Sequence, residues 1–134
     1  MNKNMREVLR ISKTLELRKV IKSLLLQFNK NVFYENADDD ARYPYIVYEL
    51  DSVDFNNTYR DDLILTISIW DKGTSTKTVE TIADNIERLD CINNPTDTVL
   101  PTFYKISRSS IPDEDKSIKR RELKFSIQNY YIGE

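Results

Sequence analysis

The stretch "SIWDKGTSTKTVETIADNIERL", Ser68–Leu89, decides the fold that this sequence predicts. A run of alternating apolar residues ends at Trp70, a turn follows at Lys72 and Gly73, and an amphipathic segment begins near Thr76. Alternation is typical of a strand, whereas the spacing after Thr76 is that of one helical face. The stretch therefore predicts a strand that is joined to a helix by a short corner.

The corner, Asp71–Lys77, has two interpretations. Glycine, lysine and hydroxyl residues at a helix N-terminus are also the components of a phosphate-binding loop. A P-loop, however, places its lysine after a second glycine, and here the lysine precedes a single Gly73. We therefore favour a structural corner formed by Trp70, Asp71, Gly73 and Thr76. In this interpretation a Ser or Thr side chain caps a helix N–H, a bond worth about 1 kcal/mol.

Before this stretch, the sequence predicts a first helix with one apolar face. That face contains Leu17, Val20, Ile21, Leu24, Leu25 and Phe28. Ser12 or Thr14 is the expected N-cap, and Asn29–Asn31 the expected end, because Asn tolerates a left-handed C-cap. Apolar residues at 8, 9 and 11 indicate an earlier helical turn, which either continues this helix or forms a separate arm within residues 1–12.

The remaining segments predict strands and loops. The expected strands are Val32–Glu35, Tyr45–Phe55, Leu63–Trp70, Thr102–Ile111 and Ile118–Ile132, with the second helix over Thr76–Leu89. The short turn Asn56–Asp62 predicts an antiparallel hairpin, and Asn93–Pro101 is expected to be a loop. The order α-β-β-β-α-β-β predicts one α+β domain over residues 1–134, with an antiparallel or mixed sheet of about five strands and both helices on one face.

The composition argues against most catalytic chemistry. The balance of 40% apolar and 31% charged residues is that of a soluble globular protein, and no run approaches the roughly 20 apolar residues of a membrane span.

The chain contains no histidine, which excludes an imidazole base. Its single Cys91 excludes an internal disulfide and is expected to be a small buried residue. The carboxylates Asp61-Asp62 and Asp113–Asp115 lie in predicted turns rather than apolar pockets. We therefore expect neither an enzyme nor a cofactor.

Two ligand classes have partial support in the sequence. Asp38, Asp39 and Asp40 are adjacent carboxylates, but they lack the alternating ligands, glycine and closing glutamate of a calcium loop, so no metal site is predicted. A nucleic-acid-binding surface is the alternative of a different class. It would use Lys119, Arg120, Arg121 and Lys124 beside Tyr130 and Tyr131. The sequence pI near 5.3 argues against it.

The net charge of −2 is unevenly distributed along the chain. Residues 1–30 contain eight Lys or Arg against two Glu, a charge of +6, and residues 31–71 contain ten Asp or Glu against two Arg, a charge of −8. Such oppositely charged regions can attract neighbouring copies; the alternative is that they are only solvated faces. The candidate interaction residues are Asp38, Asp39, Asp40, Arg42, Arg120, Arg121 and Lys124.

Three segments together resemble the tail terminator (tail completion) proteins of tailed bacteriophages. They are "YPYIVYEL" (Tyr43–Leu50), the opening stretch Ser68–Leu89, and "RRELKFSIQNYY" (Arg120–Tyr131). In that family a strand opens with YPY, a strand ending in W-D or a similar pair leads into a helix containing I-A-D-x-I, and an arginine-rich strand closes the domain. The resemblance covers residues 43–131 in order and spacing. The acidic first loop and the Asn93–Pro101 loop have no counterpart in the family pattern.

The resemblance implies a structural virion protein without catalysis. Such proteins form a homo-oligomeric ring, commonly a hexamer, which caps the tail tube, ends its polymerisation and forms the joint to the head connector. The implied partners are further copies of the chain, the tail tube protein and the head–tail connector protein. DNA would pass through the ring without sequence-specific binding, and no membrane is involved. The implied location is the tail or neck of the virion, with assembly in the host cytoplasm. Another neck, head-completion or tail component is the nearest alternative.

Overall fold

The computed structural model describes residues 3–54, 60–96 and 98–131 of the 134-residue chain. It confirms the α+β fold and the order α-β-β-β-α-β-β. The predicted strand ends at Phe55 and Ile132, and the part of the predicted turn before Arg60, lie outside the described residues. The elements are α1 (Lys3–Leu26), β1 (Val32–Tyr34), β2 (Tyr45–Asp54), β3 (Arg60–Lys72), α2 (Lys77–Ile86), the 3₁₀ turn η1 (Glu87–Leu89), β4 (Val99–Ser110) and β5 (Ile118–Tyr131).

The five strands form one mixed sheet in the order β1-β2-β3-β5-β4. β2 and β3 form the predicted antiparallel pair, and β5 pairs antiparallel with both β3 and β4. β1 runs parallel to β2. Because parallel neighbours cannot be joined by a tight hairpin, residues 35–44 must travel back along the sheet before β2 begins. The acidic loop is this return segment.

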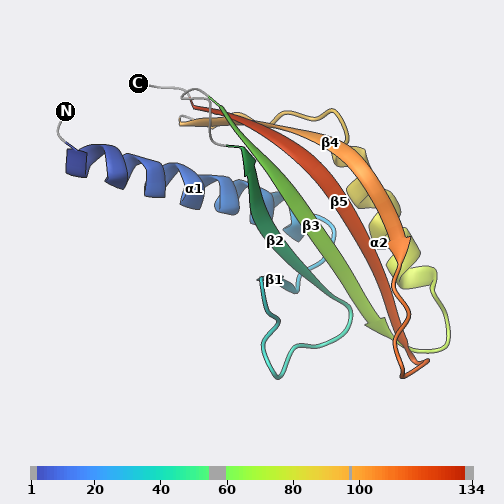
Figure 1. Ribbon diagram of the computed structural model, residues 1–134. Coiled ribbons are helices and arrows are strands. Elements are labelled where there is room, and N and C mark those ends of the chain that lie inside the picture. Colours follow the sequence, from blue (N-terminus) through green and yellow to red (C-terminus); the bar gives the residue numbers. More distant parts are fainter. Residues whose placement is uncertain (1–2, 55–59, 97, 132–134) are drawn as a thin grey trace.

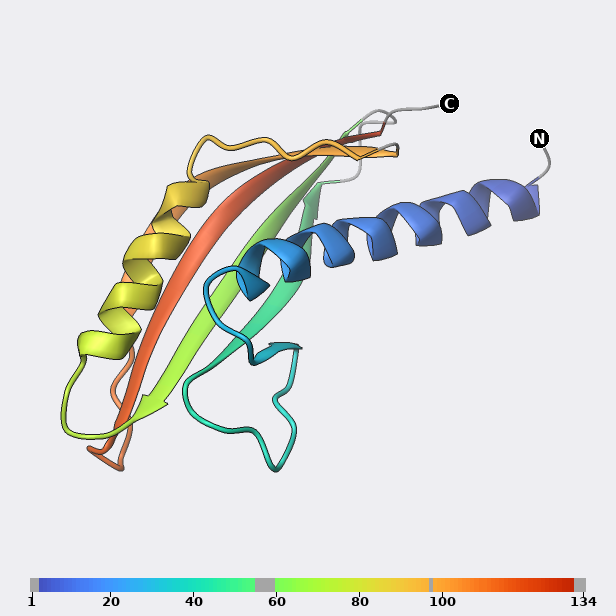
Figure 2. The same cartoon turned by 180° about the vertical axis from the view of Figure 1, so that it is seen from behind.

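Both helices cover the same face of the sheet (Figure 1 and Figure 2). The strand side chains that point to the helices alternate along β3 and β5, as predicted. In β3 they are Leu63, Leu65, Ile67 and Ile69, all buried. The α2 stripe is buried as well: Val79, Ile82, Ala83, Ile86 and Leu89. We call the opposite side of the sheet, which neither helix covers, the open face.

Helix α1 is one continuous helix from Lys3 to Leu26, so an N-cap at Ser12 or Thr14 is wrong. Residues 3–13 contain no glycine or proline and are mostly good helix formers, so the helix passes through both hydroxyl residues. The left-handed asparagine at the C-terminus is also wrong. Among the described residues other than glycine, only Glu35 and Cys91 have positive φ. The N-terminal part of α1 extends past the sheet in both views (Figure 1 and Figure 2).

Strand β4 begins at Val99, inside the segment that was expected to be a loop. Pro101 is compatible with this position because β4 is an edge strand, where a missing N–H breaks no ladder bond. The carbonyl of Pro101 accepts a hydrogen bond from the N–H of Asn94 at 3.1 Å. The segment after η1 therefore runs beside the first half of β4 and covers part of its outer edge.

Candidate interaction surfaces

A hollow of about 280 Å³ lies on the open face, where β2, β3 and β5 meet the segment that follows β1. Its lining includes Glu35, Tyr45, Glu49, Ser68, Trp70 and Arg120. These residues are distant in the sequence, and strand register brings them together. Tyr45 lies opposite Trp70 in the β2–β3 pair, and Trp70 lies opposite Arg120 in the β3–β5 pair.

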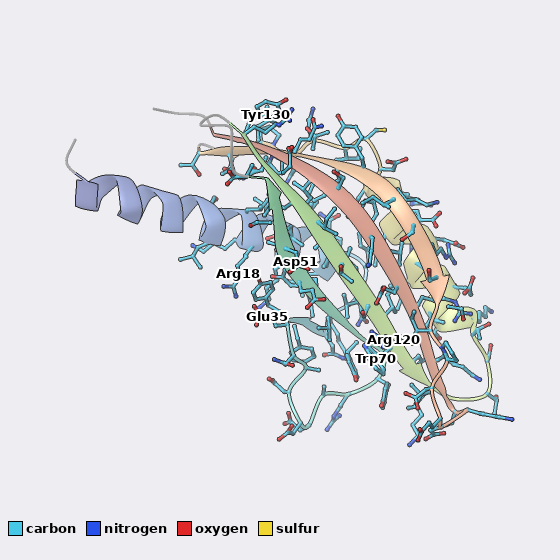
Figure 3. The ribbon with its side chains drawn as sticks, viewed as in Figure 1. Arg18, Glu35, Asp51, Trp70, Arg120 and Tyr130 are labelled. Atoms are coloured by element: carbon cyan, nitrogen blue, oxygen red, sulfur yellow. The ribbon has the colours of Figure 1, made fainter. Side chains whose placement is uncertain are left out.

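An aromatic–arginine stack forms one wall of this hollow. The rings of Tyr45 and Trp70 are stacked, with centroids 6.0 Å apart and planes inclined by 17°. Cζ of Arg120 lies 4.4 Å from the centroid of the Trp70 ring, within cation–π distance. Trp70 and Arg120 lie close together on the sheet (Figure 3). Nη2 of Arg120 donates to Ser68 Oγ at 3.3 Å, while its buried Nε has no hydrogen-bond partner within the described residues.

The uncompensated charge of the hollow is acidic. The guanidinium of Arg120 pairs with Glu122 at 3.5 Å. Glu35 and Glu49 also line the hollow, and within the described part of the chain neither forms an ion pair. Burial raises the pKa of Tyr45, with a further contribution from Tyr43, so the phenol stays neutral at ordinary pH. An aromatic wall beside unpaired carboxylates suits a cationic ligand group.

The predicted basic residues of β5 lie on two different faces. Arg120 and Lys124 point to the open face, where they lie opposite Trp70 and Thr66. Arg121 lies opposite the core residue Ile69 and therefore points to the helix-covered face. There its Nε donates to a carboxylate oxygen of Glu80 in α2, and its Nη1 donates to Ser110 Oγ at 2.9 Å. The three residues do not form one patch, and their roles in an interface stay predictions.

A second arginine, Arg108 of β4, was not identified from the sequence. It pairs with Glu80 at 2.7 Å, Asp84 at 2.7 Å and Glu87 at 3.1 Å. These bonds raise the pKa of Arg108, and the hydrogen bond from Arg108 lowers the pKa of Glu87. The sequence does indicate an acidic cluster, because these carboxylates recur at intervals of three and four, along one line of a helix. Which strand supplies their partner is not readable from the sequence.

The acidic loop is held through its backbone, with Asp38, Asp39 and Asp40 exposed. Nδ2 of Asn31 donates to the carbonyl of Arg42 at 3.2 Å, and Nδ2 of Asn29 donates to the carbonyl of Pro44 at 2.9 Å. The side chain of Arg42 is exposed too. No group of three or more metal-ligating side chains occurs within the described ranges. The loop's role in an interface stays a prediction.

Backbone N–H groups of the strand-to-helix corner donate hydrogen bonds within the chain. The N–H of Gly73, at φ 157°, donates to the carbonyl of Ser117 at 2.8 Å, and the N–H of Lys77 donates to Ser75 Oγ at 3.1 Å. The N-cap residue Thr76 makes no capping bond through its side chain. Asp71 is half-buried, and Trp70 belongs to the stack on the open face. These bonds leave little of the amide cradle that a phosphate would need, and the structural role of the corner stays a prediction.

The residues of the nucleic-acid alternative are spread over the sheet. Tyr130 lies at the opposite end of β5 from Arg120 (Figure 3). Tyr130 Oη accepts a hydrogen bond from Nη1 of Arg60 at 3.5 Å.

Cys91, expected to be buried, is exposed. No helix within the described ranges has the length and apolar character needed to span a membrane.

Comparison with known proteins adds a likeness in fold. The chain matches no protein-family model, and no curated protein resembles it in sequence. Among solved structures it is similar to a chain described as "Virion of native gene transfer agent (GTA) particle". The TM-score is 0.60 at 12% sequence identity, over 79% of this chain and 84% of that chain. What the two chains share is the fold.

Proposed function

We propose that this chain is a structural protein of a phage-like virion that caps the tail tube as an oligomeric ring. In this role it ends tail polymerisation and forms the joint to the head connector. Six copies form the ring, and DNA passes through it without sequence-specific contacts. The likeness to a chain of the gene transfer agent virion carries this proposal, because it extends over most of both chains.

The surface properties of the chain support a ring. Copies related by rotation meet through two different patches, one on each side of the subunit. The molecule has an uncovered sheet face with an acidic hollow and, on its other side, a basic helix that extends past the sheet. A polar or acidic channel would also suit DNA transit, since strong attraction to phosphates would impede movement.

The proposal is tested with purified protein and purified tail tubes. Light scattering should give the mass of a closed oligomer, and negative-stain images should show rings, alone or on tube ends. Omission of the gene should produce tails of uncontrolled length. A protein that stays monomeric and does not bind tubes would contradict the proposal, as would tails of normal length without it. Rings that bind the connector but not the tube would favour another neck or head-completion protein.

A nucleic-acid-binding module is the second candidate, favoured by the Tyr45–Trp70–Arg120 stack on the open face. Single-stranded nucleic acids bind to such aromatic and arginine surfaces. Glu35 and Glu49, which form no ion pair within the described residues, lie beside the stack and oppose this candidate, because they would repel phosphates. Salt-dependent binding of an oligonucleotide, lost on reversal of the charges of Arg120 and Lys124, would favour this candidate.

A further inference from the structure

We infer that the hollow on the open face receives the basic N-terminal part of α1, residues 3–14, from a second copy of this chain. The inference rests on the proposed function, because it assumes that several copies of the chain contact one another in a ring. It names the two surfaces that meet, which the fold likeness alone does not indicate. Three observations lead to it.

The first observation is that the N-terminal part of α1 has no sheet beneath it. The helix extends past the sheet in both views (Figure 1 and Figure 2). A helical segment that leads away from the sheet gains less stability from packing on that sheet. A protein surface that covered residues 3–14 would therefore stabilise the helix.

The second observation is the charge pattern of this segment. It contains Lys3, Arg6, Arg10 and Lys13 against the single carboxylate of Glu7. The four basic positions recur at intervals of three and four, which places them along one line of a helix. The same spacing leads on to the core residue Leu17. A run of basic residues at this spacing suits an acidic surface rather than an apolar one.

The third observation is that the hollow offers a complementary environment. Glu35 and Glu49 line it without ion pairs in the described part of the chain, beside the ring of Tyr45. Arg120 is already engaged by Glu122 and Trp70. A volume of about 280 Å³ admits one long side chain but not a helix. The helix would therefore lie across the rim and insert one Lys or Arg.

The positions of the two surfaces identify the occupant as another copy. Helix α1 lies on the helix-covered face and leads away from the sheet, whereas the hollow lies on the open face. A straight helix cannot reach the hollow of its own chain. The charges of +6 over residues 1–30 and −8 over residues 31–71 also favour an encounter between copies. Such a contact joins different patches and can close a ring.

Charge-reversal variants test this contact in the full chain. The arm variant is Arg6→Glu with Arg10→Glu, the hollow variant is Glu35→Arg with Glu49→Arg, and a third variant combines all four changes. Analytical ultracentrifugation gives the concentration at which the oligomer is half dissociated. Each one-sided variant should raise that concentration by about tenfold or more, because like charges then meet at the contact. The combined variant should recover most of the loss.

Two controls separate this contact from general charge effects. Lys19→Glu with Lys22→Glu makes the same charge change on exposed positions of α1, and Glu114→Arg changes the β4–β5 turn. Both should assemble like the parent chain, and circular dichroism should show that every variant is folded. Rings that form equally well from the arm and hollow variants, or no recovery in the combined variant, would overturn this inference while leaving the ring itself intact. A protein that is monomeric under all conditions, on tubes as well, would contradict the proposed function too.

Discussion

Arg108 extends from the edge strand β4 to three carboxylates of α2 and η1, at 2.7 to 3.1 Å. Arg121 of β5 binds one of the same carboxylates, Glu80. The two arginines thus fasten α2 to β4 and β5 at the margin of the core. Charge-assisted hydrogen bonds of this kind are about twice as strong as neutral ones, and Arg108 makes them with about a fifth of its side chain exposed.

Replacement of Arg108 by Met should destabilise the fold, because Glu80, Asp84 and Glu87 would lose a shared partner. We expect a loss of about 2 kcal/mol in the free energy of unfolding, the range of hydrogen bonds to charged groups. Urea denaturation measures it. Arg88→Met is the matched control, since Arg88 is exposed, and it should change the stability by less than about 0.5 kcal/mol. Equal losses in the two variants would show that Arg108 does not fasten α2.

The same cluster predicts a pH dependence. The hydrogen bond from Arg108 holds the pKa of Glu87 below its usual 4.5 in the folded chain. Glu87 therefore stabilises the fold above its unfolded pKa, and this contribution is lost as the pH falls through the lowered folded value. Denaturation from neutral pH down to about pH 3 should show a steeper loss of stability for the parent chain than for Glu87→Gln, which cannot titrate. Parallel curves would contradict this assignment.

At the scale of elements, residue spacing predicted the interiors of helices and strands but not all their ends. The α2 stripe and the alternation in β3 are confirmed because both depend on periodicity alone. The start of α1 was wrong because Ser12 and Thr14 are compatible with a helix interior as well as with a cap. The sequence did not predict the early start of β4, because proline is typical of loops. Proline is compatible with a strand at the edge of a sheet, and the sequence does not show that β4 is an edge strand.

The candidate surfaces show the same limit at the level of strand register. The alternation in β5 separates Arg120 from Arg121, and this follows from the sequence once the strand is recognised. The hollow does not follow, because Tyr45, Trp70 and Arg120 meet only when β2, β3 and β5 are aligned in one register. Register depends on the whole sheet and its turns. A single sequence therefore indicated the type of residue at the surface but not the site.

The buried face of α1 provides a test at this scale. Leu17 is 1% exposed and lies in the core, whereas Leu15 is 45% exposed. Leu17→Ala should cost about 3 kcal/mol of unfolding free energy, because it removes buried methyl groups and leaves a cavity. Leu15→Ala should change the stability by less than about 0.5 kcal/mol. Chemical denaturation of both variants checks the helix orientation, and a larger loss for Leu15→Ala would contradict it.

At the scale of the whole molecule, basic and acidic surfaces lie on different sides of the subunit. The basic part of α1 extends from the side of the helices, and the acidic hollow lies on the open face. Two copies bring these opposite charges together when the basic part of α1 of one copy meets the open face of the other. Contacts between identical faces would place like charges together and would be disfavoured. The charge distribution thus favours contacts between unlike patches, which can close a ring when the rotation between copies allows it.

If these charges hold the copies together, assembly should weaken with salt. The Debye length falls from about 10 Å at 0.1 M salt to about 3 Å at 1 M, which screens exposed charges. We expect the association constant, measured by ultracentrifugation, to fall over this range of sodium chloride, while the free energy of unfolding of the subunit changes little. Stronger association at high salt would contradict an electrostatic contact and would indicate an apolar one. The exposed Tyr104 and Ile106 of edge strand β4 would then be the residues to substitute next.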